Sequence, residues 1–247
     1  EYVSHQAALG SVPRSIENPI LTNSVNISGF LNMLVAAKES STIKQFVYAA
    51  SSSTYGDSPD LPKVEGNEGN PLSPYAVTKA VNEYYANVFF RVYGFKTIGL
   101  RYFNIFGPRQ NPDNPYAAVI PIFCKAFIDN IAPTINGDGL TSRDFTYVQN
   151  AVQANVKAML STNLTQDEVF NVACENQVSL NEMISQLNTI TSNNIRPIYG
   201  PERAGDVKHS KASIDKIRST LGYEPTVHFG DGLEIVFDWY NEYYKNE

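Results

Sequence analysis

Hydrophobic residues are distributed along this chain in two alternating ways, as short apolar runs and as longer segments with apolar residues at helical spacing. The short runs predict strands at 45–50, 97–107, 133–136, 144–148, 169–173 and 195–199. The helical spacing predicts helices at 19–39, 75–93, 150–161 and 180–191, with two more that begin near 213 and 230. This alternation of strand and helix predicts an α/β fold built on a parallel sheet.

The helix at 75–93 has both of its ends marked by the sequence. Ser73 and Pro74 precede it, and a proline in the first turn is typical of a helix start. Gly94 follows it, at the position where a glycine commonly ends a helix. Its boundaries are therefore the best defined in the chain.

Three side chains with related chemistry lie at or near this helix. Ser51 directly follows an apolar strand, at the end where open parallel sheets bind ligands. Tyr75 and Lys79 are four residues apart and share one helix face. Such a pair alone is more often a surface contact, but an ammonium near a phenol lowers the phenol pKa from about 10 toward that of a general base. Together the three residues predict removal of a proton from a sugar or alcohol hydroxyl as a hydride leaves the same carbon.

Composition narrows the class of protein. The chain has 247 residues, of which 43% are hydrophobic and 18% charged, as in ordinary globular proteins. Its net charge of −6 argues against nonspecific binding to nucleic acid. We find no apolar run of transmembrane length and no signal segment, which predicts a cytoplasmic protein without a membrane partner. Cys124 and Cys174 are interpreted as free thiols, and neither cysteines nor histidines have metal-ligand spacing, so no metal site is expected.

One expected motif is missing. A doubly wound dinucleotide fold begins with a strand, a glycine-rich turn and a helix, and the chain has no such glycine run. The glycines at 137 and 139 lead into a short strand and predict a turn instead. We therefore expect that the first βαβαβ part of the fold, roughly 60–90 residues, lies outside this chain.

Five segments, in order, resemble the extended short-chain dehydrogenase/reductase family. They are HQAALGS at 5–11, AASSSTYG at 49–56, YAVTK at 75–79, LRYFNIFGPRQ at 100–110 and INGDGLTSRDFTYV at 135–148. Within this family they are most similar to NAD-dependent nucleotide-sugar epimerases, and more narrowly to UDP-N-acetylglucosamine 4-epimerases of bacterial polysaccharide biosynthesis. The resemblance covers essentially the whole chain but not the N-terminal third of the family.

The resemblance implies a fold and a division into domains. The fold is an incomplete Rossmann-like doubly wound parallel sheet with a smaller α/β lobe for the substrate. Residues 1–107 and 143–174 correspond to the NAD-binding domain, and 108–142 and 175–247 to the nucleotide-sugar lobe. It also implies a homodimer that pairs the helices at 19–39 and 75–93.

The resemblance also implies a reaction and its residues. Tyr75 takes the proton from the sugar 4-hydroxyl, Lys79 lowers the Tyr75 pKa and binds the nicotinamide ribose, and Ser51 is the catalytic serine. The sugar passes through a transient 4-keto form. The NAD contacts are Ala7, Ala8, Asn26, Tyr75, Lys79, Tyr102 and Phe103. The contacts to the UDP-sugar are Ser11, Ser51, Ser52, Ser53, Asn104, Ala118, Val119, Arg143, Arg203, Asp206 and Ser210.

Two positions refine the expected substrate and reaction. Related 4,6-dehydratases carry Asp-Glu where this chain has Ser52 and Ser53, which argues against dehydration. Ser210 lies at a gatekeeper position, and its small side chain is expected to leave room for a 2-N-acetyl group. The sugar is then a UDP-N-acetylhexosamine or its uronic acid. Another epimerase or a reductase with the same three residues, and an inactive fragment that binds only the UDP-sugar, remain as alternatives.

Overall fold

The computed structural model describes residues 1–111, 118–202 and 208–245, which form two compact units. Unit 1 contains residues 1–103, 150–172 and 212–224, and unit 2 contains residues 104–149, 173–211 and 225–247. The division differs from the predicted one mainly at 143–149, which belong to unit 2, and at 212–224, which belong to unit 1. The latter segment joins unit 1 because Lys216 donates a hydrogen bond to the Val169 carbonyl and lies 5.0 Å from the Phe170 ring centroid.

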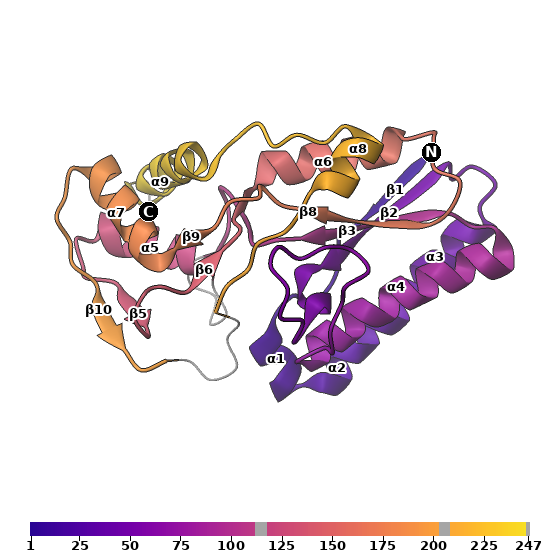
Figure 1. Cartoon of the computed structure of the whole chain (residues 1–247), viewed down its shortest axis with the longest axis horizontal. Helices are drawn as coiled ribbons and strands as arrows, with labels where there is room; N and C mark the ends of the chain where they lie inside the picture. Colours follow the sequence, from indigo (N-terminus) through magenta and orange to yellow (C-terminus); the bar gives the residue numbers. More distant parts are fainter. Residues whose placement is uncertain (112–117, 203–207, 246–247) are drawn as a thin grey trace. The chain divides into compact units, whose positions relative to one another are not determined.

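Unit 1 is built on a parallel sheet with the strand order β1-β2-β3-β8, which confirms the predicted fold class. Helices cover both faces of this sheet, α1 to α4 on one side and α6 and α8 on the other (Figure 1). The strands are β1 (Tyr2–His5), β2 (Gln45–Ser51), β3 (Thr97–Tyr102) and β8 (Glu168–Val172). The helices are α1 (Val12–Glu17), α2 (Pro19–Asn23), α3 (Gly29–Glu39), α4 (Pro74–Tyr93), α6 (Val148–Leu160) and α8 (Asp215–Leu221).

The predicted helix at 19–39 is continuous but not uniform, because a π-helical turn, Ser24–Ser28, separates α2 from α3. By length and composition, Pro19–Glu39 is apolar enough to cross a membrane, contrary to the expectation that no segment of the chain is. In unit 1, however, Phe30 and Leu34 of this helix pack into the core against Phe46 and Tyr48 of β2. We interpret it as a core-covering helix with one apolar exposed face.

Helix α4 agrees with its predicted ends. The Ser73 hydroxyl accepts a hydrogen bond from the Ala76 N–H at 3.1 Å and caps the first turn. Gly94 ends the helix in the left-handed region, with a φ of 67°. These local signals position Tyr75 and Lys79 in the first two turns of α4.

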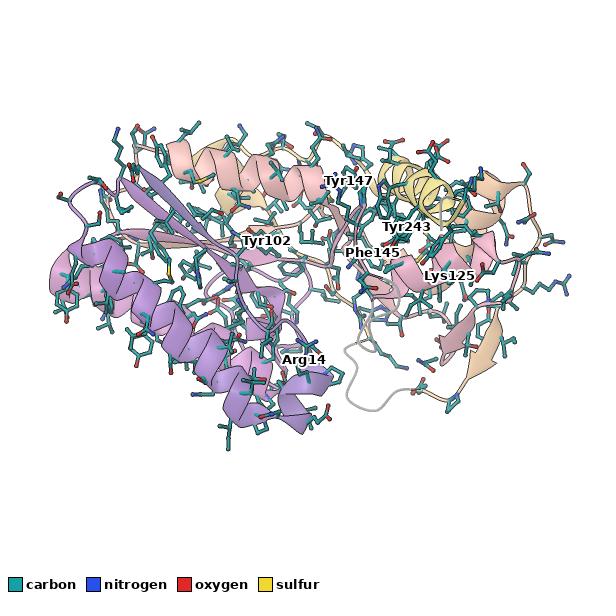
Figure 2. All side chains as sticks on the ribbon, turned by 180° about the vertical axis from the view of Figure 1, so that it is seen from behind. Arg14, Tyr102, Lys125, Phe145, Tyr147 and Tyr243 are labelled. Carbon is teal, nitrogen blue, oxygen red and sulfur yellow. The ribbon has the colours of Figure 1, made fainter. Side chains whose placement is uncertain are left out.

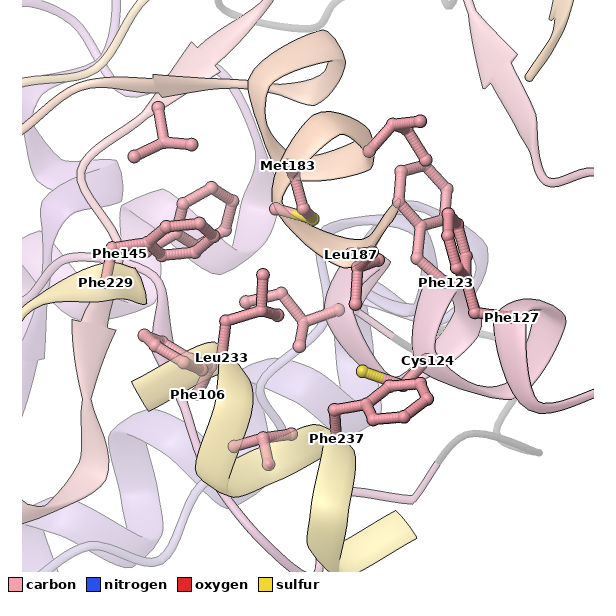
Figure 3. Close-up of a cluster of buried hydrophobic side chains, with 14 of the residues drawn as sticks. Phe106, Phe123, Cys124, Phe127, Phe145, Met183, Leu187, Phe229, Leu233 and Phe237 are labelled. Carbon is pink, nitrogen blue, oxygen red and sulfur yellow. The ribbon is translucent and has the colours of Figure 1, made fainter. Parts of the chain in front are cut away.

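Unit 2 has a separate hydrophobic core between three helices (Figure 3). Each helix contributes buried side chains to this core, among them Phe123, Leu187 and Phe237. The helices are α5 (Val119–Ile128), α7 (Leu180–Thr191) and α9 (Phe229–Lys245). Short strand pairs complete the unit: β4 (Ile105–Phe106) with β7 (Thr146–Tyr147), β5 (Thr134–Asn136) with β10 (Ile198–Gly200), and β6 (Ser142–Arg143) with β9 (Val178–Ser179).

The predicted strand at 97–107 is divided in the structure. β3 ends at Tyr102, and β4 begins only at Ile105, because Asn104 adopts a φ of 41°. The Asn104 amide donates to the Asp144 carbonyl at 3.2 Å, and its own carbonyl accepts from the Thr146 N–H at 3.3 Å. These contacts, distant in sequence, redirect the chain and start a second strand pairing.

Candidate functional site

Ser51, Tyr75 and Lys79 meet in unit 1 at the carboxyl end of β2. Ser51 is the last residue of the strand, and its hydroxyl forms a hydrogen bond with the Tyr75 hydroxyl. The Lys79 ammonium lies 6.0 Å from the Tyr75 ring centroid and donates to the Ala49 carbonyl at 2.6 Å. The structure therefore brings together the three residues that the sequence grouped.

The serines after β2 form one hydrogen-bonded turn. Ser51 caps the 3₁₀ turn Ser52–Tyr55, and its hydroxyl accepts hydrogen bonds from the Ser53 N–H at 3.2 Å and the Ser53 hydroxyl at 2.9 Å. Thr54 donates back to the Ser51 carbonyl at 2.8 Å. Because its acceptor capacity is used by Ser53, the Ser51 hydroxyl has a fixed orientation toward Tyr75.

Burial is the main influence on the electrostatics of the pair. Burial lowers the pKa of Lys79 to about 8, although the Glu83 carboxylate raises it. Burial raises the pKa of Tyr75, and the hydrogen bond with Ser51 opposes this effect. Desolvation of the phenol is thus the dominant effect in the protein on its own, where the Lys79 ammonium is directed at Ala49. The expected lowering of the Tyr75 pKa by Lys79 stays a prediction.

The residues expected to contact NAD lie around three neighbouring strand ends. Ala7 and Ala8 follow β1, and Asn26 holds the loop beyond them, because its amide oxygen accepts from the Leu9 N–H at 2.8 Å. The Asn26 amide nitrogen donates to the Leu9 carbonyl at 3.2 Å and to the Thr78 hydroxyl at 3.1 Å. The structure thus gives Asn26 a role in fixing the loop against α4, and its direct contact with NAD stays a prediction.

The end of β3 is held in a similar way. Tyr102, which lies where β3 ends (Figure 2), donates its hydroxyl to the Gln6 side chain at 3.0 Å and accepts from the Asn155 amide at 2.7 Å. The Phe103 N–H donates to the Val172 carbonyl at 3.1 Å, so a main-chain contact of Phe103 with NAD would use its carbonyl. Both residues are fixed in place by contacts within unit 1.

This arrangement fits a dinucleotide. The loop after β1, Ser51 and Tyr102 share one edge of the sheet, because β1, β2 and β3 are adjacent and parallel. A lysine ammonium has three donors, and Ala49 accepts one of them, which leaves Lys79 donors for a ribose hydroxyl. Lys79 and Tyr75 would therefore hold the nicotinamide end of NAD.

Three of the expected substrate contacts converge in unit 2, around residues 142–144. Arg143 donates from its guanidinium to the Ser142 carbonyl at 3.0 Å and to the Lys208 carbonyl at 3.2 Å. The Ser210 N–H donates to the same Ser142 carbonyl at 3.1 Å. Asn104 is bound to Asp144, the next residue after Arg143. The proposed phosphate and gatekeeper residues are thus neighbours, although Arg143 and Ser210 are 67 positions apart in sequence.

The remaining expected contacts are less informative. Ala118 is the exposed N-cap of α5 and Val119 its first residue, a favourable position for a phosphate. Ser11 caps α1, where its hydroxyl accepts from the Arg14 N–H at 3.2 Å. Arg203 and Asp206 lie outside the described residues.

A buried cluster of charged side chains, formed by Arg101, Glu83 and Glu68, was not predicted from the sequence. Arg101 of β3 binds Glu83 of α4 in a bidentate pair and also contacts Glu68. Glu83 follows Lys79 by four residues, so helical spacing was the signal that could have identified it.

Comparisons with known proteins agree with this geometry. The family model "NAD dependent epimerase/dehydratase family" matches residues 1–173. A putative UDP-glucose 4-epimerase of Methanocaldococcus jannaschii is 35% identical, over 97% of this chain and 76% of its own length.

Two solved structures are also similar to this chain. The UDP-N-acetylglucosamine 4-epimerase of Methanobrevibacter ruminantium, in complex with UDP-N-acetylmuramic acid, has a TM-score of 0.93 and 37% identity, over 98% of this chain and 77% of that one. The UDP-glucuronic acid 4-epimerase of Bacillus cereus, in complex with UDP-glucuronic acid and NAD, has a TM-score of 0.90 and 31% identity, over 98% and 76%. The chain therefore belongs to the NAD-dependent epimerase/dehydratase family of enzymes, with NAD as its cofactor.

Proposed function

We propose that this protein is an NAD-dependent 4-epimerase of a UDP-N-acetylhexosamine, or of its uronic acid, with Tyr75 as the base. The observation that carries the proposal is the meeting of Ser51, Tyr75 and Lys79 at the end of β2. When bound, NAD supplies the acceptor for the C4 hydride and a cationic ring that favours the phenolate. These residues fit proton removal from a sugar hydroxyl, because Tyr75 can accept that proton while the Ser51 hydroxyl donates a hydrogen bond to the phenolate.

The raised pKa of Tyr75 has a consequence for this mechanism. A phenol that is neutral in the protein alone gains basic character only when positive charge comes near it. The Lys79 ammonium is one such charge, and its own pKa of about 8 places it in the protonated form at neutral pH. The cationic ring of bound NAD would add a second charge, so Tyr75 would become a base only in the cofactor-loaded site.

Unit 2 supplies support for the nucleotide-sugar. Arginine recognises a diphosphate through its planar fork of donors, and Arg143 is anchored by two main-chain carbonyls. Ser210 is held beside it with a side chain too small to fill a sugar pocket. Related structures contain UDP-glucose, UDP-glucuronic acid or UDP-N-acetylmuramic acid, so the choice among sugars rests on Ser210.

The direct test is turnover of matched UDP-sugars. The NAD-loaded enzyme is incubated with UDP-N-acetylglucosamine, UDP-glucose or UDP-glucuronic acid, and the epimers are resolved by proton NMR. We expect the highest kcat/KM with an N-acetylated sugar. If no sugar is epimerised, but a UDP-4-keto sugar is reduced when it is supplied together with NADH, the reductase alternative is favoured. Binding of the UDP-sugar without turnover would favour a binding fragment.

The substitution Ser210→Tyr tests the gatekeeper. The phenol ring should fill the space for a 2-N-acetyl group, so kcat/KM should fall about 10–100-fold for UDP-N-acetylglucosamine and much less for UDP-glucose. Ser210→Ala is the matched control, because it keeps the space and removes only the hydroxyl. An equal loss on both sugars in Ser210→Tyr would contradict the assignment.

We also propose that two copies associate through helices 19–39 and 75–93. The support is an apolar stripe on α4, where Val77, Tyr84, Val88 and Val92 are 46%, 70%, 49% and 64% exposed. Their spacing of seven, four and four residues places them on one face of the helix. An exposed apolar face of this length is typical of an interface between proteins.

The substitution Val88→Arg should weaken this dimer. A charge at the centre of an apolar interface would be desolvated without a partner, so we expect the dissociation constant to rise at least about 100-fold. Sedimentation velocity over a range of concentrations measures it. Val152→Arg on α6 is the control, because Val152 is 54% exposed on a different face of unit 1. If Val88→Arg and the control sediment alike, the interface lies elsewhere.

A further inference from the structure

Arg101 is a buried cation of unit 1 that lies within the motif at 100–110, yet neither the family resemblance nor the proposed mechanism gives it a role. The residue is only 4% exposed and lies on β3. Its guanidinium donates to both Glu83 oxygens, at 2.9 Å and 2.6 Å, and to a Glu68 oxygen. The guanidinium also lies 4.9 Å from the centroid of the Tyr55 ring. One side chain is thus held by two carboxylates and one aromatic ring.

These partners connect Arg101 to both sides of the base. Tyr75, Lys79 and Glu83 follow one another at intervals of four residues, so they lie along one face of α4. Glu68 belongs to the segment 57–73, which joins the serine turn to the start of α4. Arg101 therefore fixes the helix that carries Tyr75 and the loop that leads into it.

The register of the sheet brings this cluster close to Lys79. Arg101 is paired with Ala50 across β2 and β3, and Lys79 donates to the carbonyl of Ala49, the preceding residue. The Lys79 side chain is itself only 3% exposed. A buried ammonium needs nearby negative charge, and Glu83 is the carboxylate that raises its pKa.

The charged and titratable groups around Lys79 come from four elements. On α4 they are Tyr75 and Glu83, on β1 His5, on β2 Tyr48, and on β3 Arg101. Proximity to Lys79 helps to lower the pKa of His5, after the larger effect of burial. Burial raises the pKa of Tyr48 well above its ordinary value, so this phenol is neutral. Among these groups in the described residues, Glu83 alone supplies a negative charge.

Arg101 determines whether Glu83 can supply that charge. Burial raises the pKa of the Glu83 carboxyl, and the hydrogen bonds and positive charge of Arg101 oppose this effect. Without the guanidinium, a buried carboxyl next to Glu68 would tend to protonate. Lys79 would then lose its counter-charge at the same time.

We propose that Arg101 is a positioning residue for the base, which holds the Glu83 carboxylate beside Lys79 and ties the segment 57–73 to the sheet. This inference rests on the proposed function, because it takes Tyr75 and Lys79 as the reacting pair. Arg101 acts through Glu83 and touches neither substrate nor cofactor in this scheme. Its effect on catalysis should therefore appear in the pH dependence of turnover.

The test compares kcat against pH in the NAD-loaded enzyme for Glu83→Gln, Arg101→Lys and wild type. The alkaline limb of the profile reports loss of the Lys79 proton, and removal of the Glu83 charge should move it about one pH unit lower. Arg101→Lys should move it in the same direction, because a lysine is a point charge that cannot bind two carboxylates in fork geometry. At about pH 8.5 both variants should lose about tenfold in turnover relative to wild type.

A matched control exists on the surface of the same unit. Arg218 also bridges two carboxylates, with distances of 2.6 Å to Glu224 and 3.3 Å to Asp215, but lies on α8. Arg218→Lys should leave the alkaline limb in place. Glu83→Gln preserves the shape of the side chain. NMR of the protein made with ¹³C-labelled lysine, with Lys79→Arg for assignment, measures the titration of Lys79 even where turnover is low.

The outcomes separate this inference from the proposed function. If Glu83→Gln and Arg101→Lys keep the wild-type alkaline limb and the wild-type titration of Lys79, the cluster is structural only and the inference is overturned. If wild type epimerises no UDP-sugar, or if Tyr75→Phe remains active, the proposed function itself fails. A lower limb in both variants together with an unchanged Arg218→Lys would support the inference.

Discussion

Tyr75→Phe is expected to slow epimerisation of the sugar at C4 by a factor of at least about a thousand, the largest functional effect of any single substitution in this protein. The change removes one oxygen atom from a half-buried ring and keeps its packing in the first turn of α4. It removes the hydrogen-bond partner of the Ser51 hydroxyl. It also removes the one group among Ser51, Tyr75 and Lys79 that is placed to accept the sugar proton. Turnover of UDP-N-acetylglucosamine, followed by proton NMR, measures the loss.

The loss should be confined to the chemical step. Affinity for the UDP-sugar, measured by calorimetry, should change less than about threefold, because the phenol hydroxyl contributes one hydrogen bond at most. Tyr84→Phe on the same helix is the control, since Tyr84 is 70% exposed and should keep full activity. A Tyr75→Phe variant that retains more than about a tenth of the wild-type turnover would require another base.

Gly56→Ala is expected to destabilise the fold by about 3 kcal/mol or more, the largest effect on stability that we predict. Gly56 ends the serine turn with a φ of 51° and a ψ of −124°, a conformation that side chains rarely adopt. A Cβ atom at this position would lie 1.8 Å from the Asn70 carbonyl oxygen. The atom in the way is a main-chain atom, and Asn70 is held on both sides: its N–H donates to the Asp57 carboxylate, and its carbonyl accepts from the Asp57 N–H. The loop at Asn70 therefore cannot move away from the added Cβ without breaking these hydrogen bonds.

Substitutions at two other glycines distinguish backbone strain from the steric contact with Asn70. Gly66 has a φ of 98° but no atom within 4 Å of its added Cβ, so Gly66→Ala should cost only about 1–2 kcal/mol of backbone strain. Gly10 has neither a positive φ nor a close neighbour, so Gly10→Ala should stay within about 0.5 kcal/mol of wild type. Urea denaturation measures all three. An order other than Gly56, Gly66, Gly10 would show that steric contact at Asn70 is not the cause.

Prediction from sequence succeeded where local signals suffice. The ends of α4 followed from Ser73, Pro74 and Gly94, and the structure places them within one residue. The grouping of Tyr75 with Lys79 followed from helical spacing, and Ser51 from its position after an apolar strand. The break at Asn104 could not be predicted, because its cause is hydrogen bonding to residues 144 and 146.

The sequence by itself determined the class of fold, the alternation of strand and helix and the three side chains expected to react, because these depend on periodicity and on spacing within one helix. Its apolar pattern did not predict α1, β9 or the helix α5. Only the tertiary structure decided the electrostatics of the three side chains. Burial raises the pKa of Tyr75, whereas the spacing to Lys79 suggested a lower pKa. Arg101 is an isolated charge in an apolar strand of the sequence, and only the folded chain pairs it with Glu83 and Glu68. The same holds for Arg143 and Ser210, which chain folding brings to one carbonyl of Ser142. Desolvation and contacts between distant residues are properties of the packed chain, so no local pattern encodes them.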